Sequence, residues 1–391
     1  MSAHIVAGGR IGIRLRHAAR SSLAIVLGTL ALALGVGLSP ASASPAQFVS
    51  PPIQSWRLNG QGYATVVIGD TAYVGGSFST AKSFDGKSKA TRLDLAAFDV
   101  HTGALVTTFS ADTDGVVRAL ATDGTRLFVG GGFTTIGGVA RQNLAALDPV
   151  TGDVLTGWRA DANKAVWALT EEAGVLYVGG AFGQLGGKTH GRIGSVDATT
   201  GAVRAWAPSS TGQIRALAAD PVTGDVYAGG RQTAVNGQPA AYLTKLDAAG
   251  NVVPVTFTLL KGYGQGLDLN ADGSRIAVAG ADNQVRYFDT TTGVESWHYH
   301  CDGNGQAVKI IGDTVVGGYH DGCNGVAGRD LALLDLATGA RDTSFMPVLD
   351  QFWGVASVDG NADVLVMAGR LTQVDGQVAG AFAIFPAAPT P

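Results

Sequence analysis

A short apolar run that ends in one or two glycines occurs seven times along this chain. Consecutive final glycines are separated by 38 to 55 residues. A repeat near 50 residues is typical of folds in which one supersecondary unit recurs many times. The chain is therefore expected to fold as seven similar units. The clearest copies are Ala72–Gly76, Leu127–Gly131, Leu176–Gly180 and Val226–Gly230, and weaker copies end at Gly280, Gly318 and Gly369.

Each unit contains four strand-like runs, which in the second unit are Val117–Leu120, Leu127–Gly131, Leu144–Asp148 and Val154–Trp158. A helical solenoid would need apolar residues at a period of 3.6, and these runs lack it. Glycine supplies 57 of 391 residues, which suits many tight turns. The pattern predicts an all-β fold, a seven-bladed β-propeller with four antiparallel strands per blade.

The third and fourth runs are joined by a repeated Asp-x-x-Thr-Gly or closely similar turn. The Asp side chain caps such a turn, and the glycine supplies a positive φ. The repeated aspartate is therefore interpreted as structural rather than catalytic. The five copies are Asp99–Gly103, Asp148–Gly152, Asp197–Gly201, Asp289–Gly293 and Asp335–Gly339.

The last unit ends at its third run, Phe382–Phe385, and Ile53–Arg57 matches a fourth run. The N-terminal strand, about residues 53–58, is expected to complete the last blade and remove its open edge. Each blade then has one aromatic residue in its fourth strand: Trp56, Phe109, Trp158, Trp206, Phe257, Trp297 and Phe345. The expected domain spans residues 44–388, followed by a Pro/Ala-rich tail at 387–391. Its blades are about residues 62–110, 115–160, 164–208, 212–259, 262–300, 303–347 and 351–386.

Residues 1–43 have the organisation of a signal peptide. A segment with four arginines precedes the apolar stretch Leu23–Leu38, and Ala41-Ser42-Ala43 fits a cleavage site. We expect export by the general secretory route, an extracellular protein and no membrane span after cleavage. An uncleaved N-terminal anchor is the alternative.

The charge and composition of the remaining chain exclude two classes of protein. The segment 1–43 carries four arginines and no acid, so the formal net charge of −4 becomes −8 without it. This acidic balance argues against a nucleic-acid partner. Charged residues at 15% and apolar residues at 46% exclude a mainly disordered chain.

Cys301 and Cys323 are the only cysteines, and in an exported chain they predict a disulfide. The propeller prediction places both in loops on one face, between neighbouring blades. His298, His300, His320 and Asp321 lie near them in the sequence, so a zinc site and free thiols are alternatives. The predicted sites include no metal ligand.

The innermost strands suggest a ligand site at the mouth of the central channel. Aligning them brings one large polar or aromatic residue per blade to an equivalent position, followed by alanine or glycine. Tryptophan and tyrosine rings stack on sugars, while arginine and glutamine bind hydroxyl and carboxylate groups. The alternative is that these side chains only fill the channel. The seven candidates are Tyr63, Arg118, Trp167, Arg215, Gln265, Gln306 and Trp353.

The repeats resemble those of two propeller families. Arg341–Phe345 is similar to the Leu-Asp-x-x-Phe-like end of the delta-60 repeat of secreted bacterial proteins, and Asp148 to Trp158 resembles the quinoprotein repeat. The first resemblance implies an exported propeller of undefined role, and the second a dehydrogenase that uses pyrroloquinoline quinone. The adjacent cysteine pair and a set of calcium ligands found in quinoproteins are missing here, as is the Trp-Asp signature of WD40 blades. The delta-60 resemblance is favoured.

We expect a monomeric, non-catalytic binding or scaffold module that takes a cell-envelope or environmental polysaccharide at the channel mouth. No catalytic residue is predicted, since nucleophile-elbow, P-loop and zinc-protease motifs are absent from the sequence. One alternative is an extracellular enzyme, either a quinone-dependent dehydrogenase or a polysaccharide hydrolase or lyase. Another is a platform for envelope proteins. No cofactor is expected except calcium, for which the candidates are Asp112, Asp114, Asp161, Asp302 and Asn304.

Overall fold

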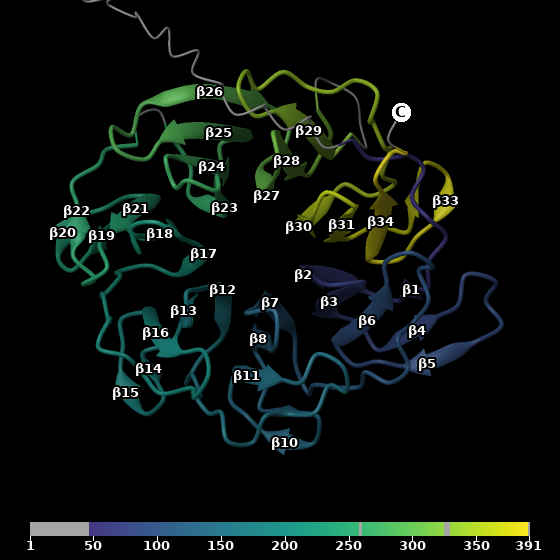
Figure 1. Ribbon diagram of the computed structural model, residues 1–391, viewed down its shortest axis with the longest axis horizontal. Helices are drawn as coiled ribbons and strands as arrows, with labels where there is room; N and C mark the ends of the chain where they lie inside the picture. The colour runs from purple at the N-terminus through teal and green to yellow at the C-terminus, as the bar shows by residue number, and fades with distance from the viewer. Residues whose placement is uncertain (1–46, 258–259, 324–328, 390–391) are drawn as a thin grey trace, which may run out of the picture. The chain divides into compact units, whose positions relative to one another are not determined.

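The computed structural model describes residues 47–257, 260–323 and 329–389, which form antiparallel sheets without a helix (Figure 1). The prediction of an all-β fold is thereby confirmed. No helix in these three ranges is long and apolar enough to cross a membrane. The predicted signal peptide at 1–43 and the last two residues of the predicted tail lie outside the described residues.

Seven principal sheets follow one another along the described part of the chain, and in each the second strand lies between the first and the third. Sheet 1 consists of β2 (Gln61–Ile68), β3 (Thr71–Ser77) and β6 (Leu95–Asp99). Sheet 2 consists of β7 (Val117–Thr122), β8 (Leu127–Gly131) and β11 (Leu144–Leu147). Sheet 3 consists of β12 (Val166–Glu172), β13 (Val175–Gly180) and β16 (Ile193–Asp197). Sheet 4 consists of β17 (Ile214–Ala219), β18 (Val226–Gly230), β21 (Leu243–Leu246) and β22 (Val252–Val253). Sheet 5 consists of β23 (Gly264–Leu269), β24 (Arg275–Gly280), β25 (Gln284–Asp289) and β26 (Glu295–His300). Sheet 6 consists of β27 (Gly305–Ile311), β28 (Thr314–Tyr319) and β29 (Leu331–Asp335). Sheet 7 consists of β30 (Val355–Gly360), β31 (Val364–Gly369) and β34 (Phe382–Pro386).

The expectation of four strands in every unit is wrong for most of the sheets. A regular fourth strand is present in sheets 4 and 5 only, among the described residues. In sheets 1, 2, 3 and 6 the fourth run makes a single antiparallel bridge, such as Leu147 to Val154. The chain then turns, because the Trp158 N–H donates to the Leu155 carbonyl at 3.0 Å. The fourth run therefore has the apolar pattern of a strand, although only one of its residues pairs with the third strand.

Short hairpins between the second and third strands were not expected from the sequence. Four of them turn on two residues with positive φ, as at Gly137 (56°) and Gly138 (72°), the geometry of tight hairpin turns. Sheet 5 lacks such a hairpin, because residues 281–283 join β24 directly to β25. The hairpin strands are β4 (Thr80–Lys82) and β5 (Lys89–Thr91); β9 (Thr135–Ile136) and β10 (Val139–Ala140); β14 (Gln184–Leu185) and β15 (Lys188–Thr189); β19 (Ala234–Val235) and β20 (Gln238–Pro239); and β32 (Gln373–Val374) and β33 (Gln377–Val378). In the first hairpin, β4 also pairs with β1 (Arg57–Leu58).

Every first strand contains a β-bulge at the same register. In sheet 2, for example, Val117 pairs with Gly131 and Ala119 with Gly130, so Arg118 is the extra, unpaired residue. A bulge bends the strand locally and re-aims a side chain. The seven bulge residues are Tyr63, Arg118, Trp167, Arg215, Gln265, Gln306 and Ala356.

Neighbouring sheets pack face to face through apolar side chains, and each first strand contacts the first strand of the next sheet. Strand β30 of sheet 7 also contacts β2 of sheet 1. Residues 48–53 lie along β34: the Val49 N–H donates to the Pro386 carbonyl and the Ile53 N–H to the Ile384 carbonyl, both at 2.9 Å. The beginning and the end of the described chain therefore share one sheet.

Candidate functional site

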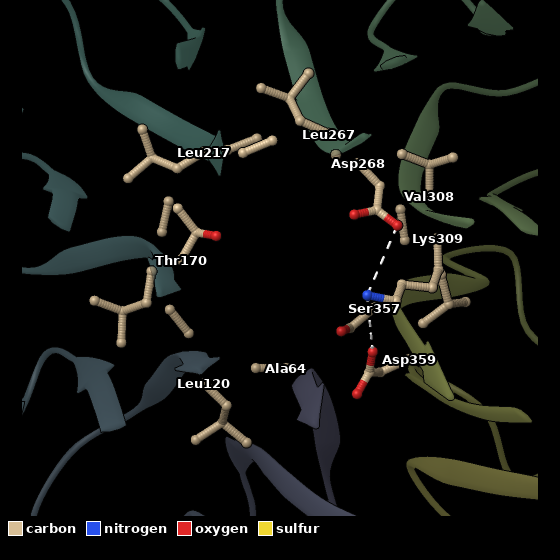
Figure 2. A pocket seen from close by; sticks show the side chains of 18 of the residues that line it. Ala64, Leu120, Thr170, Leu217, Leu267, Asp268, Val308, Lys309, Ser357 and Asp359 are labelled. Atoms are coloured by element: carbon tan, nitrogen blue, oxygen red, sulfur yellow. Dashed lines mark ion pairs between the residues drawn. The ribbon is translucent and has the colours of Figure 1, made fainter. Parts of the chain in front are cut away.

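The first strands of all seven sheets line one cavity of about 440 Å³, part of which is drawn in Figure 2. All seven bulge residues line it. Six of them are residues that the sequence proposed as a ligand site: Tyr63, Arg118, Trp167, Arg215, Gln265 and Gln306. The shared register explains why side chains distant in sequence meet here.

The sequence assigned Trp353 to the position equivalent to the bulge residues, and this assignment is wrong. Strand β30 begins at Val355. Its bulge residue is Ala356, three positions after Trp353. Gly354, with φ of 48°, belongs to the turn before the strand and was mistaken for the small residue that follows the bulge. Trp353 is 52% exposed and lines an adjoining cavity of about 380 Å³, together with Tyr63, Gln306 and Arg370.

Arginines and aromatic rings alternate along one wall of the central cavity. The Arg118 guanidinium carbon lies 5.3 Å from the ring centroid of Tyr63 and 4.3 Å from that of Trp167. The Arg215 guanidinium carbon, from the next sheet, lies 4.7 Å from the same Trp167 centroid. These distances are in the range of cation–π attraction. The contacts hold the two guanidinium groups against aromatic rings from neighbouring sheets.

Two further residues continue this alternation beyond the lining of the cavity and were missed in the sequence. Arg215 also lies 5.5 Å from the ring centroid of Tyr263, and Arg231 lies 4.9 Å from it. Tyr263 stands two residues before the bulge residue of sheet 5, and Arg231 directly follows the Gly-Gly pair of sheet 4. We call Tyr63, Arg118, Trp167, Arg215, Tyr263 and Arg231 the arginine–aromatic series.

The polar groups at the centre of this series have few partners within the protein. Within residues 47–257, 260–323 and 329–389, we find no hydrogen bond or ion pair to the Arg118 or Arg215 guanidinium. The Nε1 of Trp167 and the Nε of Arg215 are buried without an acceptor. Burial, followed by the charges of Arg231 and Arg118, lowers the pKa of Arg215, although Tyr263 acts in the opposite direction. Buried donors without acceptors are unusual and favour a ligand that supplies acceptors.

The opposite wall of the cavity carries a paired charge cluster. Lys309 lies between two aspartates, with its Nζ 3.7 Å from Asp268 and 3.5 Å from Asp359 (Figure 2). Backbone N–H groups of Ile310 and Val67 donate to these carboxylates at 2.7 and 2.8 Å. Asp268 raises the pKa of Lys309 against the effect of burial. The cluster links sheets 5, 6 and 7 and is interpreted as structural. Sequence reasoning missed it, although all three residues stand three positions after a bulge.

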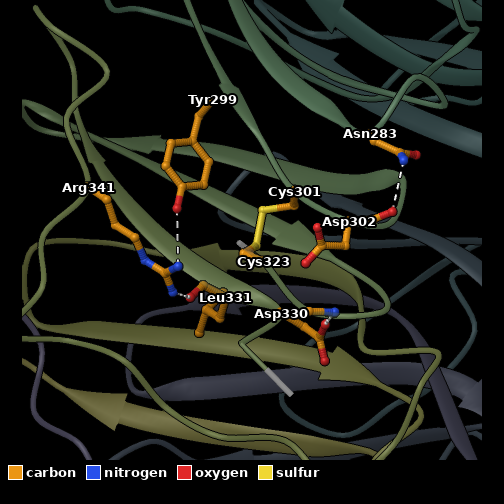
Figure 3. The surroundings of a disulfide bond; sticks show 9 residues. Asn283, Tyr299, Cys301, Asp302, Cys323, Asp330, Leu331 and Arg341 are labelled. Atoms are coloured by element: carbon orange, nitrogen blue, oxygen red, sulfur yellow. Dashed lines mark hydrogen bonds between the residues drawn. A yellow bond between two sulfur atoms is a disulfide. The ribbon is translucent and has the colours of Figure 1, made fainter. Parts of the chain in front are cut away.

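Cys301 and Cys323 form a disulfide, as the sequence predicted, with their Cα atoms 4.1 Å apart (Figure 3). It joins the end of sheet 5 to the segment after β28. The neighbouring His320 accepts a hydrogen bond at Nε2 from the Asn304 N–H, and its ring centroid lies 5.9 Å from that of Trp353. Because both sulfurs are in the disulfide, neither is left as a thiolate ligand. The described residues contain no group of three or more metal-ligating side chains.

Three of the calcium candidates have defined roles in loops. Asp114 Oδ1 accepts the N–H groups of Thr134 and Thr135, and its Oδ2 accepts the Thr134 hydroxyl. These bonds, the hydroxyl first, lower the pKa of Asp114 to about 2. Asp112 accepts the Leu93 N–H at 2.8 Å, and Asp161 accepts the Gln142 N–H at 3.0 Å. Asp302 lies beside the disulfide, and its carbonyl accepts a hydrogen bond from Asn283 (Figure 3). The fifth candidate, Asn304, donates its N–H to His320.

Comparison with known proteins gives a likeness of fold alone. No family model matches the chain, and no curated protein matches it. Among solved structures, it is similar to a computationally designed protein, Ika8, with a TM-score of 0.54 and 14% identity. The similarity covers 88% of this chain and 96% of the designed one.

Proposed function

We propose that this protein is a secreted seven-bladed β-propeller that acts as a non-catalytic polysaccharide-binding module. Seven successive sheets with contacting first strands, including β30 against β2, support the propeller. The hydrogen bonds between residues 48–53 and β34 support completion of the last blade by the N-terminal strand. The delta-60 resemblance and the disulfide support an exported protein.

One observation carries the binding function: the central cavity contains unpartnered donors and shares part of its lining with a cavity that an exposed tryptophan lines. Phe352 and Trp353 are each 52% exposed, with their ring centroids 5.3 Å apart. Trp353 lines the adjoining cavity, whose wall shares Tyr63, Gln306 and Ala356 with the central one. Exposed aromatic rings suit the apolar faces of sugars, and convergent donors suit their oxygens.

The test is a binding screen of the purified protein against cell-wall and environmental polysaccharides. The variants are Trp353→Ala and the double variant Arg118→Ala/Trp167→Ala. Each is expected to weaken binding by about 10-fold or more, since each removes part of the contact surface. The matched controls are Phe84→Ala and Arg204→Ala, because Phe84 and Arg204 line neither cavity. Absence of binding to every polysaccharide, or equal losses in the controls, would contradict the proposal.

A further inference from the structure

We infer that the polysaccharide is acidic and carries uronic acids, whose carboxylates bind Arg118 and Arg215 while a neighbouring sugar packs on Trp353. This inference rests on the proposed function and specifies its ligand. It starts from an imbalance of charge within the central cavity. Arg118 and Arg215, at the bulge positions, have no carboxylate within ion-pair distance in the described residues. The acidic residues that line the same cavity stand three to five positions after the bulge of their strands: Glu171, Glu172, and the two aspartates paired with Lys309, Asp268 and Asp359.

This cationic wall does not follow from the composition of the chain. Acidic residues outnumber lysine and arginine, 31 to 27. Arg118 and Arg215 nevertheless flank the same ring, that of Trp167, at 4.3 and 4.7 Å from its centroid. The charge of Arg118 contributes to the lowered pKa of Arg215, so the two cations disfavour each other. An anion bound to both guanidinium groups would offset this repulsion.

The aromatic rings of the series position the arginines rather than the sugar. The expectation that Trp167 stacks on a sugar is replaced, because the guanidinium groups of Arg118 and Arg215 already lie over its ring. Held in this way, each guanidinium keeps N–H donors in a rigid planar fork. Such a fork matches the two oxygens of a carboxylate. The structure thus favours a planar oxyanion in the cavity and leaves sugar stacking to Trp353.

The two cavities share part of their lining. Tyr63, Gln306 and Ala356 line both the cavity of about 440 Å³ and that of about 380 Å³. The arginines line one cavity and Trp353 the other, which suits an occupant built of several linked sugars. Between them, Gln306 and Gln265 offer amide groups for hydroxyls, although Gln265 Nε2 already donates to the Gly305 carbonyl at 3.0 Å. An oligosaccharide with acidic groups meets these requirements.

The experiment compares acidic oligosaccharides with their uncharged counterparts by calorimetry. The probes are hexamers from polygalacturonate, alginate and hyaluronate, each with its fully methyl-esterified form, and a phosphorylated mannan oligosaccharide. At least one uronate is expected to bind about 10-fold or more tightly than its ester, with an affinity that falls as salt rises. Arg118→Met and Arg215→Met should abolish this preference, and Trp353→Ala should weaken acid and ester alike.

Arg118→Lys and Arg204→Met serve as controls. Lysine keeps the charge but loses the fork, so Arg118→Lys should bind with intermediate affinity. Arg204→Met should behave as the unmodified protein, and unchanged thermal unfolding will show that each variant is folded. Equal affinity for acid and ester, or a preference that survives Arg118→Met, would overturn the inference but not the proposed function. Binding of phosphorylated mannan alone would overturn the carboxylate assignment, and binding of no glycan would overturn both proposals.

Discussion

Single charged residues in this protein fall into two groups according to their partners. Arg286 is buried in sheet 5 and pairs with Asp282 at 3.1 Å and with Glu295. Glu295 also binds His298 at 2.7 Å. Arg118 and Arg215, in contrast, meet rings rather than carboxylates. An unpaired buried charge destabilises a fold. The stability of the structure therefore does not explain why Arg118 and Arg215 lie without carboxylate partners.

Asp330 makes the stability of the protein depend on pH. Burial raises the pKa of this carboxyl to about 7, and one oxygen accepts the Gly322 N–H while the other is buried without a partner. Between pH 4 and pH 7 the folded state therefore holds a proton that the unfolded state releases. Stability should fall as pH rises through this window. Figure 3 shows Asp330 in the surroundings of the disulfide.

Asp330→Asn is expected to remove this dependence. At pH 8 the variant should be more stable than the unmodified protein by about 1 to 3 kcal/mol, because no ionised carboxylate is then buried. Near pH 4, where the carboxyl is protonated, the two should be similar. Thermal unfolding of both proteins from pH 4 to pH 8.5 checks this. Parallel pH profiles would contradict the expected role of Asp330.

At the scale of elements, the repeated turn and the repeated tryptophan form one contact between sheets. Trp297 Nε1 donates to the Leu336 carbonyl at 2.9 Å, in the turn of the next sheet. Gly339 of that turn has φ of 71°, and a Cβ there would lie 2.7 Å from the Trp297 ring. Trp158 and the turn of sheet 3 repeat the arrangement. The glycine is thus required by its conformation and by close packing.

Gly339→Ala is expected to destabilise the protein by about 2 to 4 kcal/mol, from left-handed backbone strain and overpacking together. Gly312→Ala is the matched control. Gly312 has φ of 56° but nothing within 4 Å of an added Cβ, so only strain of about 1 kcal/mol is expected. Urea unfolding of both variants measures the difference. Equal losses would show that the ring contact contributes nothing.

Sequence patterns predicted the elements better than their lengths. The first three strands of each sheet follow from apolar runs and their glycines, and the capping role of Asp148 agrees with its bonds to the N–H groups of Val150 and Thr151. The fourth strands were overestimated, because an apolar pattern does not show where a ladder stops. Trp353 was misplaced for a related reason. Ala356, the true bulge residue, is itself small and gives no signal.

At the scale of the whole molecule, the N-terminal segment is part of the core of sheet 7. Phe48 is 6% exposed and packs with Phe345 and other buried residues of sheets 6 and 7. The sequence predicted residues 53–58 for this place, whereas the hydrogen bonds to β34 come from Val49 and Ile53. The site could be located from the sequence because one position per repeat faces the cavity. Contacts between repeats, such as Lys309 with Asp268, could not, since they depend on how neighbouring sheets are staggered.

Phe48→Ala is expected to lower the free energy of unfolding by about 3 to 4 kcal/mol. If the segment is an integral part of the fold, the loss should appear in one cooperative transition. Phe84→Ala is the control, because Phe84 is 40% exposed and should change stability little. Thermal unfolding followed by both tryptophan fluorescence and circular dichroism checks this. A separate early transition would mean that the segment detaches independently of the sheets.

The seven bulges described above have a consequence for engineering. A bulge residue has no cross-strand partner, so its identity is not tied to the backbone pairing of its strand. The chain already places tyrosine, arginine, tryptophan, glutamine and alanine at this position on the same backbone. The fold therefore separates a constant frame from seven interchangeable side chains that share one cavity. Randomising those seven codons would generate a library of receptors on a single scaffold.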